Sequence, residues 1–127
     1  MRAIELHSPG AELQAALRPC ERPDPQPGPA EVLVRVAACA VCRTDLQLVS
    51  RDLPAHRLPV VPGHQVVGTV QAVGVGVDDV RLGERVGLVW LAGACGRCRF
   101  CLEGRENLCE QATFTGWDRD GGYATHV

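Results

Sequence analysis

The chain has 127 residues, of which 46% are apolar but only 4% aromatic, and its 13 basic and 15 acidic side chains give a net charge of −2. A chain of this length is typical of one domain, since domains usually run to roughly 100–200 residues. Nucleic acids and anionic membranes are held by uncompensated positive charge, so the near-neutral balance argues against both as partners. The apolar runs are far shorter than the about 20 residues of a membrane-spanning helix. With no export signal at the N-terminus, we expect a cytoplasmic location.

The predicted secondary structure consists mainly of short strands, marked by alternating or β-branched apolar residues. In chain order these strands cover residues 2–6, 31–38, 65–73, 85–91 and 123–127. Five prolines between residues 19 and 29 exclude a helix or an interior strand, so that segment should run extended over the surface. The best helix candidate covers residues 42–49, with Thr44 and Asp45 in its first turn. Short strands separated by glycine and proline turns, with little helix, predict a compact β-barrel or sandwich.

A dense group of cysteines lies in the last third of the sequence. The chain has seven cysteines, an odd number, and in a reducing compartment such clusters more often hold metal than form disulfides. The group has the spacing C-x2-C-x2-C-x7-C and comprises Cys95, Cys98, Cys101 and Cys109. Four thiolates at this spacing can surround one zinc ion as a tetrahedron, and they leave no position open for water or substrate. The segment 95–109 is therefore predicted to be a structural zinc lobe.

Other chemistries use cysteines at similar spacings. In the bacterial iron–sulfur run the fourth cysteine follows the third by four residues and precedes a proline, whereas here the gap is eight residues and Glu110 follows. Ordinary thiols or disulfides are the second alternative. A nucleic-acid-binding zinc ribbon fits poorly, because residues 95–110 carry three arginines and three glutamates, whose charges cancel. The spacing favours zinc.

A second pair of candidate metal ligands, Cys42 and His64, stands apart from this lobe. Catalytic zinc accepts a thiolate and an imidazole among three protein ligands, with the fourth position open to water or substrate. Two residues are an incomplete set, and a lone cysteine and a lone histidine are more often buried packing residues. From the residues alone both interpretations stay open. Weaker ligand candidates are Cys39, Cys20 and His56.

The order and spacing of these motifs resemble one known family. The run Gly63-His64-Gln65-Val66-Val67-Gly68 is preceded by Cys42-Arg43-Thr44-Asp45 and followed by the four-cysteine group with Glu106-Asn107-Leu108-Cys109. This arrangement closely resembles the zinc-dependent alcohol dehydrogenases of the medium-chain family, over essentially the whole chain. The resemblance implies a GroES-like β-barrel catalytic domain with short helices over residues 1–127. In the family this domain is normally followed by a Rossmann domain that binds NAD or NADP, which we expect to be missing from this chain.

The resemblance implies roles for the two residues of the second pair and for two neighbouring side chains. Cys42 and His64 match catalytic zinc ligands, and Asp45 matches the carboxylate that orients the histidine. Thr44 resembles the hydroxyl that hydrogen-bonds the alcohol and starts proton transfer outward. Zinc would stabilise the alkoxide at neutral pH, and hydride would pass to the nicotinamide. The implied activity is NAD(P)-linked oxidation of small-molecule alcohols to aldehydes or ketones, or the reverse. In the plain structural alternative, Thr44 and Asp45 only start a helix.

Two further positions match the family at the edges of the site. Arg43 looks like the residue that reaches the cofactor pyrophosphate, and Trp90 resembles a wall of the substrate pocket in the tetrameric microbial branch. Their structural alternatives are a solvated charge and a core residue. Gln65 stands where many members carry glutamate, and Gln47 stands where a histidine often ends the proton relay. The pH dependence of turnover should therefore not be assigned to a histidine at position 47.

The family's third catalytic ligand, usually a cysteine, lies downstream of the matched region, as does the cofactor domain. We therefore expect an amino-terminal fragment with a filled structural site, an empty or partly occupied catalytic site and no dehydrogenase activity on its own. Uncovered barrel surface should promote self-association, and the intact enzyme is expected to be a homo-oligomer. The rival hypothesis is a stand-alone zinc-stabilised barrel that binds a partner protein and catalyses nothing.

Overall fold

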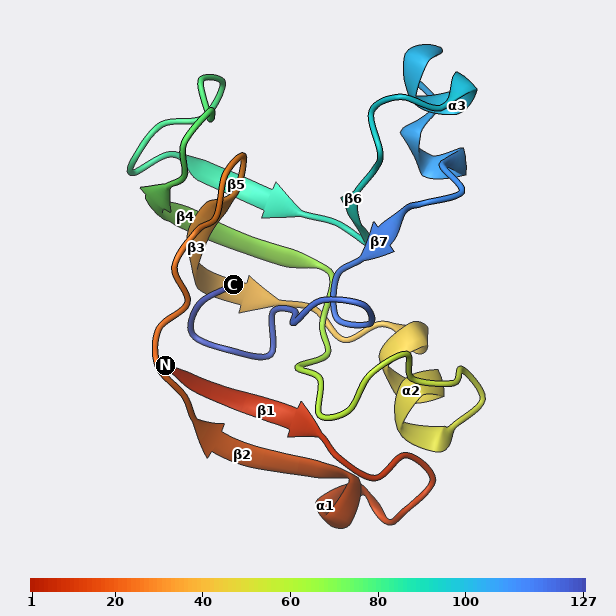
Figure 1. Ribbon diagram of the computed structural model, residues 1–127. Coiled ribbons are helices and arrows are strands. Elements are labelled where there is room, and N and C mark those ends of the chain that lie inside the picture. Colours follow the sequence, from red (N-terminus) through yellow and green to blue (C-terminus); the bar gives the residue numbers. More distant parts are fainter.

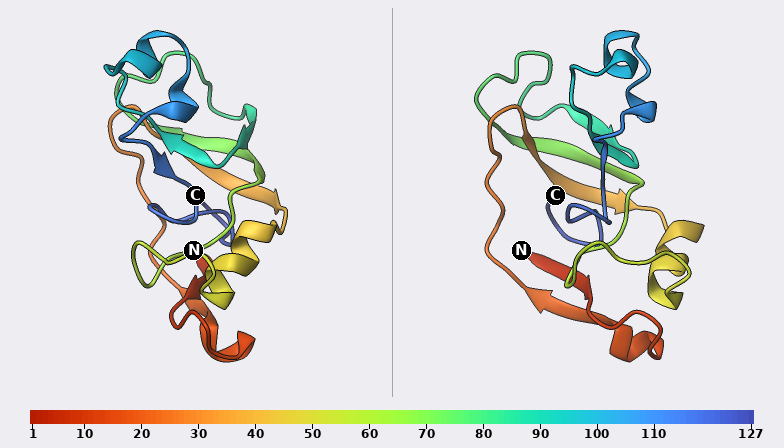
Figure 2. Two further views of the ribbon diagram at one scale, coloured as in Figure 1. Left: turned by 90° about the vertical axis from the view of Figure 1, so that its right-hand side faces the viewer. Right: turned by 45° about the vertical axis from the view of Figure 1, so that its right-hand side comes forward.

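The computed structural model describes all 127 residues and is built mainly from short antiparallel strands. The strands are β1 (Arg2–Leu6), β2 (Leu17–Glu21), β3 (Val32–Cys39), β4 (Val66–Val73), β5 (Arg85–Leu88), β6 (Leu91–Gly93) and β7 (Thr113–Phe114). The helical segments are α1 (Leu13–Ala16), α2 (Arg43–Ser50), α3 (Arg99–Leu102) and the 3-10 turn η1 (Glu106–Leu108). Three sheets have the orders β1-β2, β3-β4-β5 and β6-β7. The segment with α3 and η1 projects from the body beyond β6 and β7, at the blue end of the colour scale (Figures 1 and 2).

The last residues of the chain join two of these sheets. The Ile4 N–H donates to the Tyr123 carbonyl at 2.8 Å, and Val34 and Val127 exchange two N–H···O bonds at 2.7 and 2.9 Å. The segment 123–127 therefore lies between β1 and β3, as Figure 1 shows. It connects the β1-β2 pair to the three-stranded sheet, and the chain forms the β-barrel that the strand pattern predicts.

The sequence analysis predicts neither β7 nor the short segments α1, α3 and η1, and three further places differ from it. Residues 123–127 pair only through isolated bridges, at Ala124 and His126, because they change partner from β1 to β3 within a few residues. The predicted strand 85–91 is two strands, since β5 ends at Leu88 and β6 begins at Leu91 in a different sheet. Pro19 lies inside β2, where it is tolerated because β2 is an edge strand; the rest of the proline-rich segment is extended, as predicted.

The core is aliphatic, as a chain so poor in aromatic residues requires. Leu6, Ala16, Leu48 and Val60 form one cluster with no exposed surface. These residues come from β1, α1, α2 and the segment before β4, so the cluster fixes α2 against the β1-β2 pair. Helix α2 begins with Arg43 and is the predicted helix, shifted by one residue. No helix of the chain has both the length and the apolar character needed to span a membrane.

Candidate metal centres

The first candidate centre lies at the N-terminus of α2. Cys42 is the N-cap residue, with extended backbone, and the Asp45 Oδ2 accepts a hydrogen bond from the Cys42 N–H at 2.8 Å. This reciprocal capping starts the helix at this point and holds the two side chains in a fixed relation. The Thr44 Oγ1 lies 3.9 Å from the Cys42 Sγ. The thiol, the hydroxyl and the carboxylate therefore share one end of α2.

Asp45 also reaches a second segment, the loop that precedes β4. Its Oδ1 accepts a hydrogen bond from the Gly63 N–H at 3.1 Å and lies 3.5 Å from the Nδ1 of His64. Asp45 and His64 are only 3% and 5% exposed. The Nδ1 of His64 has no hydrogen-bond partner, and the Asp45 carboxylate is the acidic group beside it. One carboxylate thus ties the helix that carries Cys42 to the loop that carries His64.

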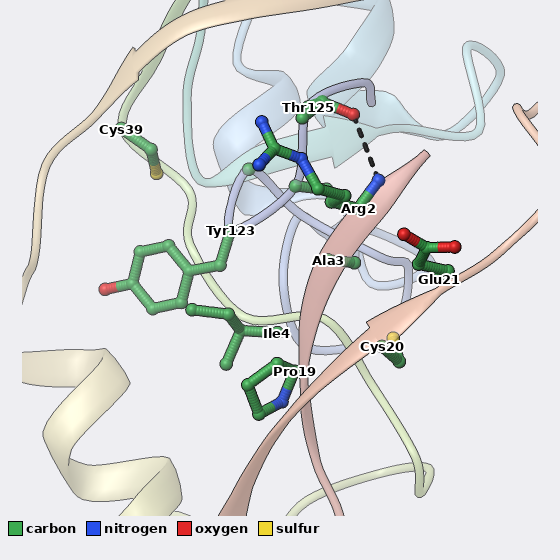
Figure 3. A pocket seen from close by; sticks show the side chains of 11 residues that line it. Arg2, Ala3, Ile4, Pro19, Cys20, Glu21, Cys39, Tyr123 and Thr125 are labelled. Atoms are coloured by element: carbon green, nitrogen blue, oxygen red, sulfur yellow. Dashed lines mark hydrogen bonds between the residues drawn. The ribbon is translucent and has the colours of Figure 1, made fainter.

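Tyr123 and Cys39 pack against Gly63, the residue before His64. Gly63 has φ +94°, and a Cβ there would lie 2.6 Å from the Tyr123 Cδ1 and 2.8 Å from the Cys39 Sγ. Both side chains also line a cavity of about 700 Å³ whose other walls come from β1, β2 and the segment 122–125 (Figure 3). Burial, and then the Asp45 carboxylate, raises the pKa of the Tyr123 hydroxyl, and burial also raises the pKa of the Cys39 thiol. Both groups are therefore neutral at neutral pH.

The remaining predicted site residues lie in different surroundings. The ring of Trp90 meets the ring of His64 edge-on, with centroids 4.8 Å apart. Arg43 is exposed on the first turn of α2, and Gln47 is half-buried one turn later. His56 stacks on Trp117, with ring centroids 3.8 Å apart. Asp45 thus lies beside both the Cys42–Thr44 end of α2 and His64, and His64 in turn contacts Trp90. Arg43 lies at the surface.

The second candidate centre is the four-cysteine lobe. The sulfurs of Cys98 and Cys101 lie 3.5 Å apart, those of Cys95 and Cys101 lie 3.9 Å apart, and all four lie within 4.8 Å of one another. Thiolates about 2.3 Å from a zinc ion at tetrahedral corners are separated by roughly 3.8 Å. The spacing of the sulfurs therefore fits a zinc ion, and no disulfide joins any of the seven cysteines.

Backbone amides in the lobe are directed at the sulfurs. The Cys98 N–H donates to the Cys95 Sγ and the Gln111 N–H donates to the Cys109 Sγ, each at 3.3 Å. The N–H groups of Arg97 and Cys98 lower the pKa of the Cys95 thiol to about 6, whereas loss of solvent and the Cys98 thiol raise that of Cys101 to about 12. Four sulfurs this close cannot all be thiolates unless a cation offsets their repulsion. Four thiolates at these positions would therefore fit a bound cation.

Comparisons with known proteins agree with this description. The family model for the alcohol dehydrogenase GroES-like domain matches residues 28–127. A protein of Mycobacterium tuberculosis named "Probable alcohol dehydrogenase AdhA" is 47% identical, over 98% of this chain and 37% of its own length. A thermostable alcohol dehydrogenase of Pyrobaculum aerophilum, solved with cobalt and zinc bound, has a TM-score of 0.89 and 36% identity, over 100% of this chain and 38% of its own. An Escherichia coli protein described as a short chain alcohol dehydrogenase, complexed with NADH, has a TM-score of 0.86 and 31% identity, over 100% of this chain and 35% of its own.

The chain therefore belongs to the alcohol dehydrogenase GroES-like domain family, as its motifs predict. It is a zinc-family alcohol dehydrogenase domain with a GroES-like β-barrel and a four-cysteine cluster. It spans about a third of the length of the relatives it matches. Zinc and nicotinamide cofactors are thus characteristic of the family to which this domain belongs.

Proposed function

We propose that residues 1–127 form the zinc-binding part of the catalytic domain of an NAD(P)-linked alcohol dehydrogenase, located in the cytoplasm. The observation that supports this proposal is the position of Asp45, whose buried carboxylate bonds the Cys42 N–H on one segment and lies beside the buried His64 on another. A helix cap needs only the bond to the Cys42 N–H, whereas Asp45 also reaches the segment that carries His64. Its two hydrogen bonds and its approach to a histidine are typical of the carboxylates that orient metal-binding imidazoles.

Each residue of the first centre would have a different role in the reaction. Cys42 and His64 would hold a zinc ion, with Asp45 fixing the ring of His64 so that its other nitrogen, Nε2, is left for the metal. When bound, the ion would acidify an alcohol hydroxyl at neutral pH. Thr44 Oγ can accept a proton from the substrate hydroxyl and donate its own onward, since a hydroxyl is both donor and acceptor. Trp90 would bound the space beside His64 where the substrate carbon chain lies, and Arg43, exposed beside Cys42, would reach the cofactor pyrophosphate.

The second centre has a different role in this proposal. Four sulfurs fill the coordination sphere of a zinc ion and leave no place for substrate, so Cys95, Cys98, Cys101 and Cys109 would hold a structural ion. The first centre offers one thiolate and one imidazole, which is fewer than the three protein ligands of a catalytic site. A third ligand and the NAD or NADP domain would be supplied by further polypeptide. In this proposal residues 1–127 alone do not turn over alcohol, and the intact enzyme is a homo-oligomer that acts on small-molecule alcohols and aldehydes.

Cobalt titration of the chain tests the two centres separately. Co²⁺ gives intense charge-transfer absorption when bound by four thiolates and a distinct, weaker spectrum when bound by one thiolate and one imidazole. We expect one tight site, followed by a weaker second site that is lost in Cys42→Ser and in His64→Ala. Cys20→Ser and His7→Ala are matched controls, since both residues lie outside the two centres. A second site that survives Cys42→Ser and His64→Ala contradicts the proposal.

A chimera tests the activity. Residues 1–127 would be joined to the downstream two thirds of the Mycobacterium tuberculosis relative, which is 47% identical in the shared region. The chimera is expected to reduce NAD or NADP in the presence of alcohol, and Cys42→Ser and His64→Ala are expected to abolish that turnover. Full turnover in either variant would contradict the roles proposed for Cys42 and His64, whereas a folded chimera that turns over no alcohol would favour the binding-module hypothesis.

A further inference from the structure

Only two buried side-chain polar atoms of the chain lack a hydrogen-bond partner, and both belong to residues beside the first candidate centre. They are the Nδ1 of His64 and the hydroxyl oxygen of Tyr123. Buried polar groups are nearly always hydrogen-bonded in folded proteins, so each exception calls for an explanation. Two exceptions in one place indicate a shared acceptor that serves both.

The Asp45 carboxylate is the acceptor that both atoms face. Its Oδ1 lies 3.5 Å from the Nδ1 of His64. It also acts on the Tyr123 hydroxyl, because burial and then the charge of this carboxylate raise the pKa of that hydroxyl. Tyr123 therefore keeps its proton at neutral pH and is a donor, whereas an ionised carboxylate can only accept. The pairing of the two groups is chemically complementary.

Asp45 has acceptor sites left for these two donors. A carboxylate offers about four acceptor sites, two on each oxygen. The Oδ2 accepts the Cys42 N–H at 2.8 Å and the Oδ1 accepts the Gly63 N–H at 3.1 Å, so one site remains on each oxygen. The sites that remain therefore match the two unpartnered donors, a His64 ring protonated at Nδ1 and the Tyr123 hydroxyl.

The position of Tyr123 is fixed by its backbone and by its ring. Its N–H donates to the Pro62 carbonyl at 3.0 Å, and its carbonyl accepts the Ile4 N–H at 2.8 Å. The ring lies against Gly63, where an added Cβ would be 2.6 Å from Cδ1 and 2.9 Å from Cε1. The ring thus runs beside the residue that gives its own N–H to Asp45, and the hydroxyl lies at the end of the ring remote from β2 (Figure 3).

We infer that Tyr123 is a positioning residue, whose hydroxyl donates to the Asp45 carboxylate and through it holds the His64 ring with Nε2 free for metal. The inference rests on the proposed function, which makes His64 a metal ligand, but the bond between Tyr123 and Asp45 exists without metal. With Tyr123 on one acceptor site, the carboxylate cannot turn away from His64, and Nδ1 stays the protonated nitrogen. Tyr123 touches neither metal nor substrate in this arrangement.

Tyr123→Phe removes the hydroxyl and keeps the ring, so the metal-free chain gives the first test. Loss of a hydroxyl that bonds a carboxylate lowers stability, whereas loss of an unpartnered buried hydroxyl is neutral or stabilising. We expect the midpoint of urea unfolding to fall. NMR of the imidazole nitrogens should also show more of the His64 tautomer protonated at Nε2, and His64→Ala assigns that signal among the four histidines. A midpoint that does not fall, or an unchanged tautomer, overturns the inference.

A double-mutant cycle tests whether Tyr123 acts through Asp45. Cobalt titration measures the affinity of the first centre in Tyr123→Phe, in Asp45→Asn and in the double variant. Tyr123→Phe alone should weaken Co²⁺ binding there by about three- to tenfold, less than loss of the direct partner of the histidine, and should leave the four-cysteine site unchanged. In the Asp45→Asn background it should have no further effect, because residues that act through one another are not additive. Equal effects in the two backgrounds contradict the inference.

Thr125→Val is the matched control. Thr125 lines the same cavity as Tyr123, but its Oγ1 bonds the Arg2 N–H and the His126 ring. The replacement also removes one hydroxyl group, and it is expected to change neither the His64 tautomer nor the cobalt affinity of the first centre. Changes as large as those in Tyr123→Phe would show that loss of any hydroxyl nearby has this effect, and they would overturn the inference.

Metal binding separates this inference from the proposed function. Suppose that no cobalt site depends on Cys42 and His64, while Tyr123→Phe shifts the His64 tautomer and its effect on the urea midpoint disappears in Asp45→Asn. The positioning of His64 by Tyr123 is then confirmed and the proposed function fails. If cobalt binding depends on Cys42 and His64 but Tyr123→Phe changes neither the tautomer nor the affinity, the proposed function stands and the inference fails.

Discussion

The Oδ1 of Asp45 lies 3.5 Å from the Nδ1 of His64, and both side chains are almost completely buried. The same carboxylate caps α2 at Cys42 and accepts the Gly63 N–H. A single side chain therefore links local helix formation to the long-range placement of a candidate metal ligand. Loss of this carboxylate should affect both the stability of the domain and its affinity for metal.

Asp45→Asn tests this link. An amide has one oxygen where the carboxylate has two, so either the Cys42 N–H or the Gly63 N–H loses its acceptor, and the negative charge beside His64 is lost. We expect metal affinity at the first centre to fall about 10–100-fold, and the free energy of unfolding to fall by about 1–3 kcal/mol. Cobalt titration and urea unfolding measure the two effects. Asp52→Asn, whose carboxylate is exposed and bonds only Ser50, should change neither.

Removal of metal from the four-cysteine lobe should have a local effect. The segment 95–109 contains only α3 and η1, which are one turn each, and of its four cysteines only Cys109 is buried. Such a segment has too few apolar contacts to stay folded once a cation no longer links its sulfurs. With a strong chelator, hydrogen exchange is expected to accelerate across the lobe while β3 and β4 keep their protection. Unchanged exchange in the lobe, or equal loss of protection throughout the barrel, contradicts this prediction.

Most of the barrel could be predicted from the sequence because its strands have local signals. Alternating apolar residues mark β1, β3 and β4, and Asp45 three residues after Cys42 marks the start of α2. β2 could not be predicted, because Pro19 removes a backbone donor and only the pairing with β1 shows that its position is at an edge. The irregular pairing of residues 123–127 depends on two partners far away in sequence, so no local pattern contains it.

The two candidate sites also differ in how much of each could be predicted from local sequence patterns. The four cysteines are close in sequence, so their spacing alone predicts a common centre. By contrast, the approach of Tyr123 to Gly63 joins residues 60 positions apart, and nothing near Tyr123 indicates it. The rings of His56, Trp90 and Trp117, which stack on one another, likewise come from three separate segments. The family resemblance indicated Trp90, but its partners become visible only in the folded chain.

Gly63→Ala is expected to be strongly destabilising. The new methyl group would overlap the Tyr123 ring and the Cys39 thiol, and φ at this position is +94°. Overpacking together with a left-handed backbone should lower the free energy of unfolding by about 2–4 kcal/mol. Gly76→Ala is the matched control, since Gly76 has φ +85° but no atom within 4 Å of the added methyl. If the two variants lose equal stability in urea unfolding, backbone strain alone explains the effect and the contact with Tyr123 contributes nothing.

The pairing of Glu31 with Arg119 should make stability depend on pH. The Gly28 N–H, 3.0 Å from the Glu31 Oε2, and then the Arg119 guanidinium lower the pKa of this carboxyl. A pKa that is lower in the folded state gives stability that is complete above the unfolded value of about 4.3 and is lost as pH falls through the folded value. Because both side chains are partly exposed, solvent screening limits the contribution to about 1 kcal/mol at most.

Glu31→Gln should therefore be less stable than the wild type at pH 7 and equally stable at the acid end of the titration. Thermal unfolding between pH 3 and pH 7 measures the difference. Glu12→Gln removes an exposed carboxylate without an ion pair and serves as the control. A stability difference between Glu31→Gln and the wild type that stays constant down to pH 3 would show that the charge of Glu31 is not involved.

Self-association of the chain is expected through the cavity lined by β1, β2 and the segment 122–125. Its lining includes Ile4, Pro19 and Tyr123, and the side chain of Ile4 is 41% exposed although it lies in the middle of β1. Contact between copies would remove this apolar surface from water, which is favourable by about 25 cal/mol per Å². Light scattering coupled to size exclusion, in reducing buffer, should show a mass that rises with concentration. Ile4→Glu should shift the mass toward the monomer, whereas Val75→Glu, at an 84% exposed turn residue outside the cavity, should not. A constant monomeric mass, or equal effects of the two variants, contradicts association through this surface.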